Sequence, residues 1–94
     1  MSRMNPVRPS WFYTYVLKSE KDGKMYVGTT SNLQHRLNQH QNGLVFSTKH
    51  RRPLNLIYAE ACLNKDDAFR RERYLKTSMG KRYLRNRLTG GLKG

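Results

Sequence analysis

The 94-residue sequence has little of what several protein classes require. Its single cysteine, Cys62, cannot form an internal disulfide, which fits a reducing compartment, and we expect a cytoplasmic protein. We expect Cys62 itself to be a small buried residue at a strand end. No apolar run approaches the roughly 20 residues of a membrane-spanning helix, and the first ten residues do not resemble a signal peptide. We therefore expect neither a membrane span nor a secretory leader.

Acidic residues are also scarce: six stand against 19 Lys and Arg, and the formal net charge is +13. Such an excess attracts polyanions, and nucleic acid is the commonest polyanion available to a soluble cytosolic protein. Association with ribosomes or with a membrane surface fits the same charge. Charge supplies affinity and salt dependence but no reaction, so any chemistry must come from particular side chains.

Several catalytic patterns are missing as well. One cysteine and three scattered histidines make a poor zinc ligand set. The sequence contains no phosphate-binding or dinucleotide-binding glycine motif, and nothing supports a serine or cysteine triad. With 36% apolar residues, the chain can form one compact core. We predict a lead-in over residues 1–10, a single domain over 11–88 and a flexible tail over 89–94.

The most informative segment is an aromatic hairpin. Residues 11–19 and 25–29 are rich in aromatic and β-branched residues and flank a turn signal at Asp22-Gly23. If paired residue numbers sum to 41 or 43, Tyr15 and Tyr26 lie on the same face of the sheet, and a shift of one residue would separate them.

A short helix is predicted to follow, capped by Thr30 or Ser31 and ending near Gln41. Leu33 and Leu37 form its apolar stripe. At 100° per residue, Arg36 lies about 60° and His40 about 20° from Leu33. A purely structural helix would favour apolar residues at these positions. The alternative is that Arg36 extends to solvent and His40 is a satisfied histidine at the helix end.

The second half of the chain adds a carboxylate in an unusual position. We predict a loop over 41–53, a strand over 54–61, a helix from Asn64 to Thr77, a break over 78–80 and a last basic helix over 81–88. Glu72 falls about 40° from Ala68, on the apolar face of its helix. A carboxylate there must be paired or bind a cation, and the simple alternative is an ion pair with Lys76.

Together these side chains supply what phosphodiester hydrolysis needs. Glu72 can hold Mg²⁺, with Mn²⁺ as a substitute, because this ion prefers oxygen ligands and keeps several waters. Arg36 offers a bidentate fork to phosphate. A tyrosine or histidine within hydrogen-bond reach can accept a proton. The residues alone leave open which group is the general base.

The stretches YTYVL, MYVG, LQHRLNQH and RRERYLK occur in an order that resembles the GIY-YIG nuclease domain, in its small stand-alone bacterial form (UPF0213-like). The resemblance covers about residues 12–88. It implies an α/β fold, a small three-stranded antiparallel sheet flanked by helices in the order β-β-α-β-α-α. It implies that Tyr15 and Tyr26 are the tyrosines of the two motif halves. Arg36 would stabilise the phosphate, Glu72 would ligate a divalent metal, and His40 would match a histidine one turn beyond the arginine.

The chain departs from the motif at two positions in its first half, where Tyr13 and Thr14 replace Gly and Ile, and Val27 conservatively replaces Ile in the second half. Our leading hypothesis is a Mg²⁺-dependent endonuclease of DNA with weak sequence preference, selective for structured or single-stranded substrate, with RNA as a further possible substrate. The alternatives are a non-catalytic nucleic-acid-binding module and a nuclease subunit that needs a targeting partner. We expect a monomer or weak dimer. The candidate phosphate contacts are Lys49, Arg51, Arg52, Arg70, Arg71 and Arg73.

Overall fold

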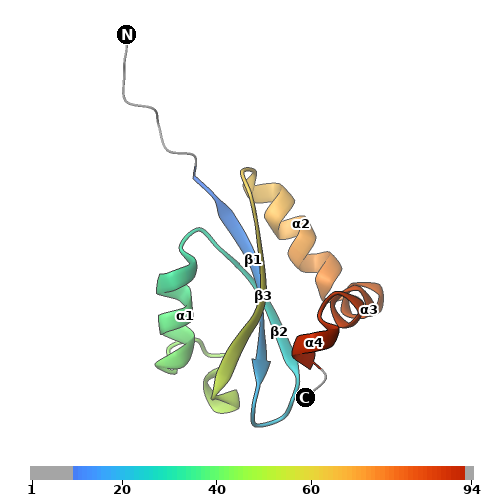
Figure 1. Ribbon diagram of the computed structural model, residues 1–94. Coiled ribbons are helices and arrows are strands. Elements are labelled where there is room, and N and C mark those ends of the chain that lie inside the picture. The colour runs from blue at the N-terminus through green and yellow to red at the C-terminus, as the bar shows by residue number, and fades with distance from the viewer. Residues whose placement is uncertain (1–9, 93–94) are drawn as a thin grey trace.

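The computed structural model describes residues 10–92 of the chain. A three-stranded antiparallel sheet separates one helix on one face from three helices on the other (Figure 1). The sheet has the order β2-β1-β3 and consists of β1 (Phe12–Ser19), β2 (Met25–Thr30) and β3 (Leu54–Cys62). The helices are α1 (Leu33–Gln41) on one face and α2 (Lys65–Leu75), α3 (Ser78–Arg87) and the one-turn α4 (Thr89–Leu92) on the other. The predicted fold class is confirmed.

The register of the hairpin places the two tyrosines as predicted. Tyr15 pairs with Gly28 and Leu17 pairs with Tyr26, so paired numbers sum to 43. Because side chains alternate between faces along a strand, Tyr15 and Tyr26 are diagonal neighbours on the same face. That face carries α1.

Each face of the sheet has its own apolar core, and β1 contributes to both through this alternation. Towards α2 and α3 the buried residues are Val16, Val27, Leu75 and Leu84. Towards α1 they are Tyr15, Leu17 and Leu54, with Tyr26, Leu33 and Leu37 packed against them. The core facing α1 therefore has a tyrosine at its centre.

The start of α1 differs from the prediction. Its N-cap is Asn32, whose Oδ1 accepts a hydrogen bond from the His35 amide at 3.1 Å. Thr30 instead belongs to β2, and its Oγ1 accepts from the Asn32 amide at 3.1 Å in the connecting turn. The hydroxyl that we predict as a cap thus stabilises the turn that leads into the helix.

The junction between α2 and α3 is tighter than predicted. Asn64 caps α2 through the amide of Asp67 at 3.0 Å, as expected. However, α2 ends at Leu75, and α3 begins at Ser78, where we expected a break. Thr77 is the N-cap of α3, its Oγ1 accepting from the Gly80 amide at 3.0 Å. Gly80 does not break the helix, because the lack of a side chain lets α3 approach the end of α2.

The remaining segments complete the outline. The predicted loop after α1 contains a 3-10 turn, η1 (Lys49–Arg51). Cys62 is only partly buried, contrary to expectation, and its thiol lies 3.3 Å from the carbonyl oxygen of Asn64. The predicted tail begins with α4, while the predicted lead-in over residues 1–10 lies outside the described residues except for Ser10. Within the described part of the chain, no helix is both long and apolar enough to span a bilayer.

Candidate active site

A buried chain of hydrogen bonds lies between the sheet and α1. The hydroxyl of Tyr15 is 2.8 Å from Nε2 of His40, and Nδ1 of His40 is 2.8 Å from Oγ1 of Thr48. All three side chains are essentially inaccessible to solvent. The imidazole of His40 is thus held at both nitrogens, by β1 on one side and by the segment after α1 on the other.

The close packing around Tyr15 depends on a glycine. Gly28 lies opposite Tyr15 on β2, and the Tyr15 ring covers its Cα. A Cβ at position 28 would lie 2.5 Å from the Tyr15 hydroxyl oxygen and 2.7 Å from its Cζ. Real Cβ atoms essentially never make contacts this short. Gly28 therefore sets the position of the Tyr15 hydroxyl relative to His40.

Burial keeps both Tyr15 and His40 neutral. Loss of hydration raises the pKa of Tyr15 to about 12, although a hydrogen bond to Arg36 lowers it in part. Burial, followed by the positive charge of Arg36, lowers the pKa of His40 to about 4. At neutral pH the pair is therefore a neutral phenol beside a neutral imidazole.

Arg36 extends from α1 over the two phenols. Hydrogen bonding to Tyr15 is the main cause that raises the pKa of Arg36, and Tyr26 contributes. One Nη of Arg36 also donates to Oε1 of Gln39 at 3.1 Å. The guanidinium is partly exposed, so it is fixed in orientation and remains accessible to a phosphate. We considered the alternative that Arg36 simply extends into solvent. Its contacts with Gln39 and Tyr15 do not fit that alternative.

Tyr26 forms the accessible side of the same cluster. Its ring centroid lies 5.2 Å from that of His40 and 6.4 Å from that of Tyr15. Unlike Tyr15, Tyr26 is only partly buried. The structure therefore brings four of the five predicted catalytic residues together on the α1 face of the sheet: Tyr15, Tyr26, Arg36 and His40.

The fifth, Glu72, approaches from the other face. It lies on α2, and its Oε1 accepts from the Thr29 hydroxyl on β2 at 2.5 Å. Its Oε2 lies 2.7 Å from Nζ of Lys76, so the predicted alternative, an ion pair within the helix, is also present. The Glu72 side chain is 18% exposed and that of Lys76 is 54% exposed. The carboxylate therefore points towards the sheet and not into bulk solvent.

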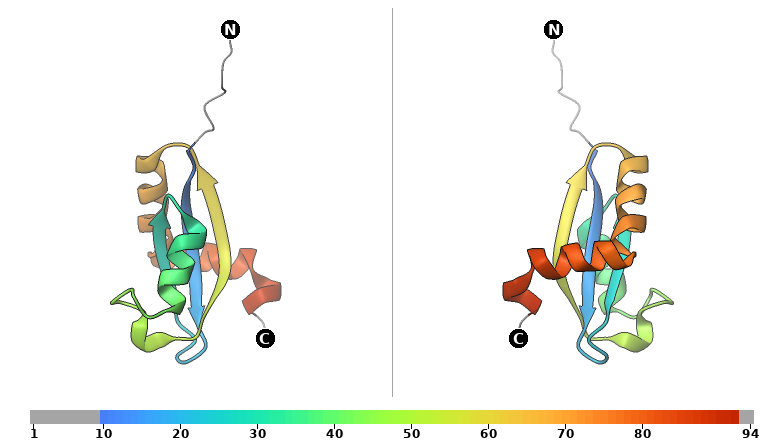
Figure 2. Two further views of the ribbon diagram at one scale, coloured as in Figure 1. Left: turned by 90° about the vertical axis from the view of Figure 1, so that its left-hand side faces the viewer. Right: turned by 90° about the vertical axis from the view of Figure 1, so that its right-hand side faces the viewer.

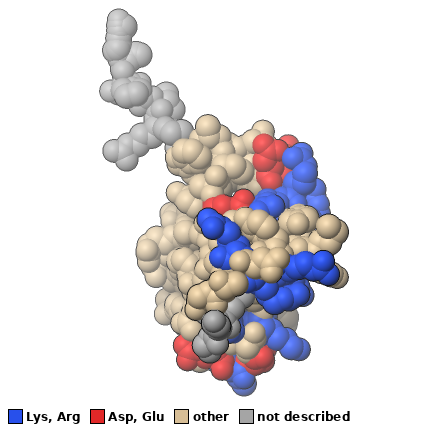
Figure 3. Space-filling model, turned by 45° about the vertical axis from the view of Figure 1, so that its right-hand side comes forward, with Lys and Arg blue, Asp and Glu red and all other residues tan. Residues whose placement is uncertain are grey.

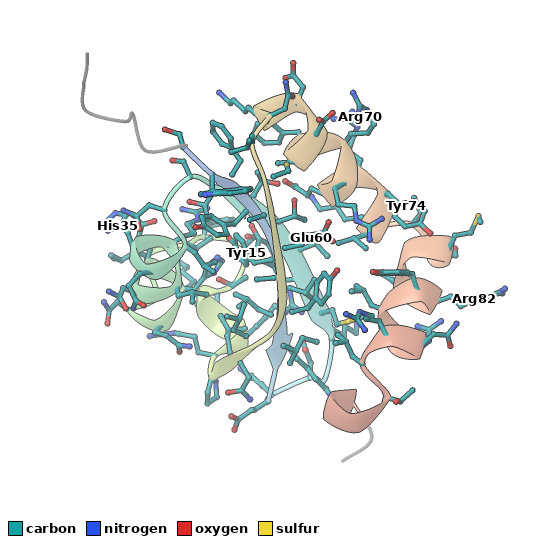
Figure 4. The ribbon with its side chains drawn as sticks, turned by 45° about the horizontal axis from the view of Figure 1, so that its top comes forward. Tyr15, His35, Glu60, Arg70, Tyr74 and Arg82 are labelled. Carbon is teal, nitrogen blue, oxygen red and sulfur yellow. The ribbon has the colours of Figure 1, made fainter. Side chains whose placement is uncertain are left out.

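Glu72 and Tyr15 lie on opposite faces of the sheet near its β2 edge. β2 is an edge strand, so a side chain from α2 can reach past it towards the opposite face. The negative charge of Glu72 contributes to the raised pKa of Tyr15. Figure 4 shows the two faces: Tyr15 lies on the α1 side of β3 and Glu60 on the α2 side, while His35 points away from the sheet. The candidate site thus spans the β2 edge.

A divalent cation at this edge would have one protein carboxylate. Among residues 10–92, no group of three or more His, Cys, Asp or Glu side chains is arranged to hold a metal. Glu72 and the Thr29 hydroxyl supply oxygen atoms of the type that Mg²⁺ prefers, with water or substrate oxygens completing the shell. The Lys76 pair would have to open, at a cost of about 0.5 kcal/mol or less for an exposed pair of this type. The donor set therefore fits Mg²⁺ bound jointly with a substrate.

The predicted phosphate contacts lie in two groups. Lys49, Arg51 and Arg52 lie in and after η1, and Arg70, Arg71 and Arg73 lie on α2. Arg51 pairs with Asp22 at 3.2 Å, and Arg70 pairs with Asp67 at 2.8 Å, both near the surface.

Arg71 is the most constrained of the six. It pairs with Glu60 at 3.0 Å and lies over the rings of Tyr74 and Tyr83, 5.2 Å and 4.7 Å from their centroids. Such stacking with a paired guanidinium ties β3, α2 and α3 together. Arg71 therefore has a packing role in addition to any contact with phosphate.

Sequence reasoning did not identify three residues that build the site. Gly28 provides the space for Tyr15, Thr48 holds His40, and Thr29 holds Glu72. The register of the hairpin could have indicated Gly28, since it lies opposite Tyr15.

A basic surface lies on the other face of the molecule. Figure 3 shows Lys and Arg side chains gathered over the face formed by α2 and α3. The exposed basic residues of α3 are Lys81, Arg82, Arg85 and Arg87.

The changed first half of the motif is accommodated without an unpaired polar group. Thr14 is buried and faces α2, where its hydroxyl donates to the carbonyl oxygen of Ala68 at 3.0 Å. The motif has an apolar isoleucine at this position. The buried hydroxyl of Thr14 is tolerated there because it has a hydrogen-bond acceptor in the backbone of α2. Tyr13 lies between Thr30 and Ala61 in the sheet and is partly buried.

The chain is similar to known proteins over most of its length. The family model described as the GIY-YIG catalytic domain matches residues 11–86. The chain belongs to the GIY-YIG family. It is a family of nucleases.

Among curated proteins, the chain is 35% identical over 71 residues to a UPF0213 protein of Desulfotalea psychrophila, covering 73% of this chain and 63% of that protein. It is 43% identical over 65 residues to a UPF0213 protein of Clostridium perfringens, covering 68% and 69%. The solution NMR structure of a UPF0213 protein from Bacillus halodurans has a TM-score of 0.53 and 31% identity, covering 86% of this chain and 87% of that one. These names specify no reaction.

Proposed function

We propose that the chain is a divalent-metal-dependent endonuclease that hydrolyses DNA phosphodiester bonds with weak sequence preference and with selectivity for structured or single-stranded DNA. The observation that carries the proposal is the buried sequence of contacts from Tyr15 through His40 to Thr48, placed beneath Arg36. A protein that only binds DNA needs no proton acceptor, whereas a neutral imidazole held at both nitrogens beside a phenol is an arrangement that can accept a proton.

The contacts support a definite direction of proton transfer. The Arg36 guanidinium beside Tyr15 can only donate hydrogen bonds, so we assign the Tyr15 oxygen as the acceptor towards Arg36 and the Tyr15 proton to the contact with Nε2 of His40. His40 then carries its ring proton on Nδ1, facing Oγ1 of Thr48. Tyr15 is inaccessible to solvent in this state, so its oxygen would have to be uncovered when a bound phosphate draws Arg36 away from it. The oxygen could then accept a proton from an attacking water as its own proton passes to His40, so that no isolated phenolate forms. This tautomer is an assignment from the network.

Substrate binding would strengthen this base. The positive charge of Arg36 is the second cause of the low pKa of His40. A phosphate bound to Arg36 offsets that charge and raises the pKa of His40 towards its ordinary value. The imidazole therefore becomes a better proton acceptor when the scissile phosphate is in place. The same contact lets Arg36 stabilise the charge that develops on the phosphate.

Glu72, oriented by Thr29, would hold the divalent cation, Mg²⁺ or Mn²⁺. When bound, the cation supplies positive charge for the leaving oxygen. The protein's own contribution is to place that charge at the β2 edge, across the sheet from Tyr15. Lys76, which pairs with Glu72 in the absence of a cation, would have to release the carboxylate for a cation to bind there.

The test is cleavage of supercoiled plasmid, branched DNA and single-stranded DNA, with Mg²⁺ or with EDTA. We expect cleavage that requires the metal and is lost in Glu72→Gln. The matched control is Glu20→Gln, because Glu20 is an exposed carboxylate that contacts Asn55 on the surface. Absence of cleavage by the wild-type chain on every substrate, or equal cleavage by Glu72→Gln, would refute the proposal.

One observation favours a second candidate, a non-catalytic nucleic-acid-binding module. Both carboxylate oxygens of Glu72 already have partners in Thr29 and Lys76. In such a module Glu72→Gln would weaken stability but leave DNA binding intact, and no DNA would be cut. A requirement for a protein partner would appear as cleavage restored by a co-purified protein.

A further inference from the structure

The segment between α1 and η1 displays an aromatic ring to solvent in a fixed position. Phe46 is 84% exposed and its neighbour Leu44 is 71% exposed, whereas Val45 and Thr48 are buried. The backbone is held at both ends: the Leu44 amide donates to the Gln39 carbonyl at 2.9 Å and the Thr48 amide to that of Val45 at 3.1 Å. Two large apolar side chains exposed two residues apart on an anchored segment form a patch of the kind that marks an interaction site.

The charge around Phe46 indicates the kind of partner. Nζ of Lys49 lies 5.2 Å from the centroid of its ring. A basic pocket begins beside it, lined by Lys21, Gln41, Lys49, His50, Arg52 and Pro53. A protein partner of ordinary composition would meet uncompensated positive charge here. An aromatic ring beside a track of cations is instead the arrangement that binds single-stranded nucleic acid.

This segment is also connected to the candidate active site. Phe46 is two residues from Thr48, whose hydroxyl contacts His40, so the two Cα atoms lie within about 7 Å of each other. In both views of Figure 2 the segment after α1 projects on the side of the sheet where β2 and α2 lie. A strand that follows the β2 edge past Glu72 would therefore reach Phe46.

We propose that Phe46 stacks on an unpaired base of the bound strand, one step away from the scissile phosphate, while Lys49 contacts the adjoining phosphate. The inference deepens the proposed function by naming a residue that selects unpaired nucleotides. It depends on nucleic-acid binding but not on cleavage. Stacking on an aromatic side chain suits every base, which agrees with weak sequence preference.

The test compares two labelled 12-nucleotide strands by fluorescence anisotropy in EDTA, so that no cutting occurs. One is oligothymidylate and the other carries reduced abasic sites, with the same number of phosphates. We expect the wild-type chain to prefer the strand with bases. In Phe46→Ala the ratio of the two affinities should fall at least about fivefold, the loss of one stacked base. Affinity for the abasic strand should stay the same.

Three variants separate stacking from other roles. Phe46→Tyr keeps a ring and should keep the preference, whereas Phe46→Leu keeps apolar surface without a ring and should behave like Phe46→Ala. Met79→Ala, at a 70% exposed residue on α3, is the control and should change nothing. An unchanged ratio in Phe46→Ala, or a wild-type ratio in Phe46→Leu, would overturn the inference. If the wild-type chain binds neither strand, the proposed function fails as well.

Discussion

The substitution Gly28→Ala tests most directly how the site is held together. The added methyl group would collide with Tyr15, whose hydroxyl forms the hydrogen bond with His40. The new Cβ would lie 2.5 Å from the Tyr15 hydroxyl oxygen and 2.7 Å from Cζ. Ordinary contacts of this kind are about 3.5 Å, so the ring must move by roughly 1 Å. Tyr15 is fully buried and has no free space into which it can turn. The 2.8 Å contact with His40 is then lost or severely bent.

The magnitude follows from two costs. Overpacking a core position costs about 1–3 kcal/mol, and leaving the buried hydroxyl and imidazole unpaired costs about 1–3 kcal/mol more. The free energy of unfolding should therefore fall by roughly 2–6 kcal/mol. For a domain of this size each kcal/mol lowers Tm by about 4–8 °C. Thermal and urea unfolding followed by circular dichroism measure both quantities.

A double-mutant cycle with Tyr15→Phe identifies the cause. In the Tyr15→Phe background the hydrogen bond is already absent, so Gly28→Ala should cost at least about 1 kcal/mol less than in the wild-type chain. Gly90→Ala is the control, because a Cβ at Gly90 meets nothing within 4 Å. Additive effects, or a stability of Gly28→Ala within 0.5 kcal/mol of wild type (roughly the noise expected of a surface substitution), would refute the argument.

The other predictions concern the helix junction and the buried imidazole. Gly80→Ala should lower Tm further than Gly28→Ala, because its Cβ would lie 2.5 Å from the backbone Cα of Leu75, which cannot rotate away; a melting curve like that of wild type would contradict this. The pKa of His40 is lowered to about 4 in the folded chain, so the unfolded state binds more protons below pH 6.5, and stability should fall by roughly 3 kcal/mol between about pH 6.5 and 4. Urea unfolding across this range measures the fall, which His35→Gln, on the exposed side of α1, should retain and His40→Gln should reduce. Thr48→Val should cost about 1–3 kcal/mol by leaving Nδ1 of His40 unpaired, whereas Thr48→Ser should cost less; equal losses in both would argue against the hydrogen bond.

The parts of the fold that could be predicted depend on neighbours in sequence. The hairpin itself follows from a short turn signal between two aromatic strands. The sequence placed Tyr15 and Tyr26 on one face only if paired residue numbers sum to 41 or 43, and the sum of 43 is found. The cap at Asn64 follows from local hydrogen bonding to Asp67. The cap of α1 could not be chosen, because Thr30, Ser31 and Asn32 are all good capping residues. The choice depends on where β2 ends: because the strand continues to Thr30, the helix can begin only after it, and Asn32 becomes the cap.

The parts of the site that could not be predicted depend on contacts between distant segments. Thr48 reaches His40 because the loop after α1 folds back beneath the helix, and no local pattern specifies that path. Thr29 reaches Glu72 over 43 positions of sequence, across two layers. The unusual positions of His40 and Glu72 on their helices indicated that each needs a partner, but a helical period says nothing about which residue that partner is.

The edge position of β2 would let a single carboxylate serve a site on the opposite face, as the proposed function requires. In the middle of a sheet, the backbone would separate a side chain on one face from a phenol on the other by a full layer. At an edge strand the two faces meet around one backbone, and β2 is the shortest of the three strands, with 6 residues against 8 and 9. Thr29 fixes the orientation of the Glu72 side chain. Its hydroxyl holds Glu72 against the edge, whereas the exposed pair with Lys76 could turn the carboxylate outward at little cost. In the proposed nuclease, the hydrogen bond from Thr29, and not the ion pair, would therefore keep a cation held by Glu72 at the β2 edge.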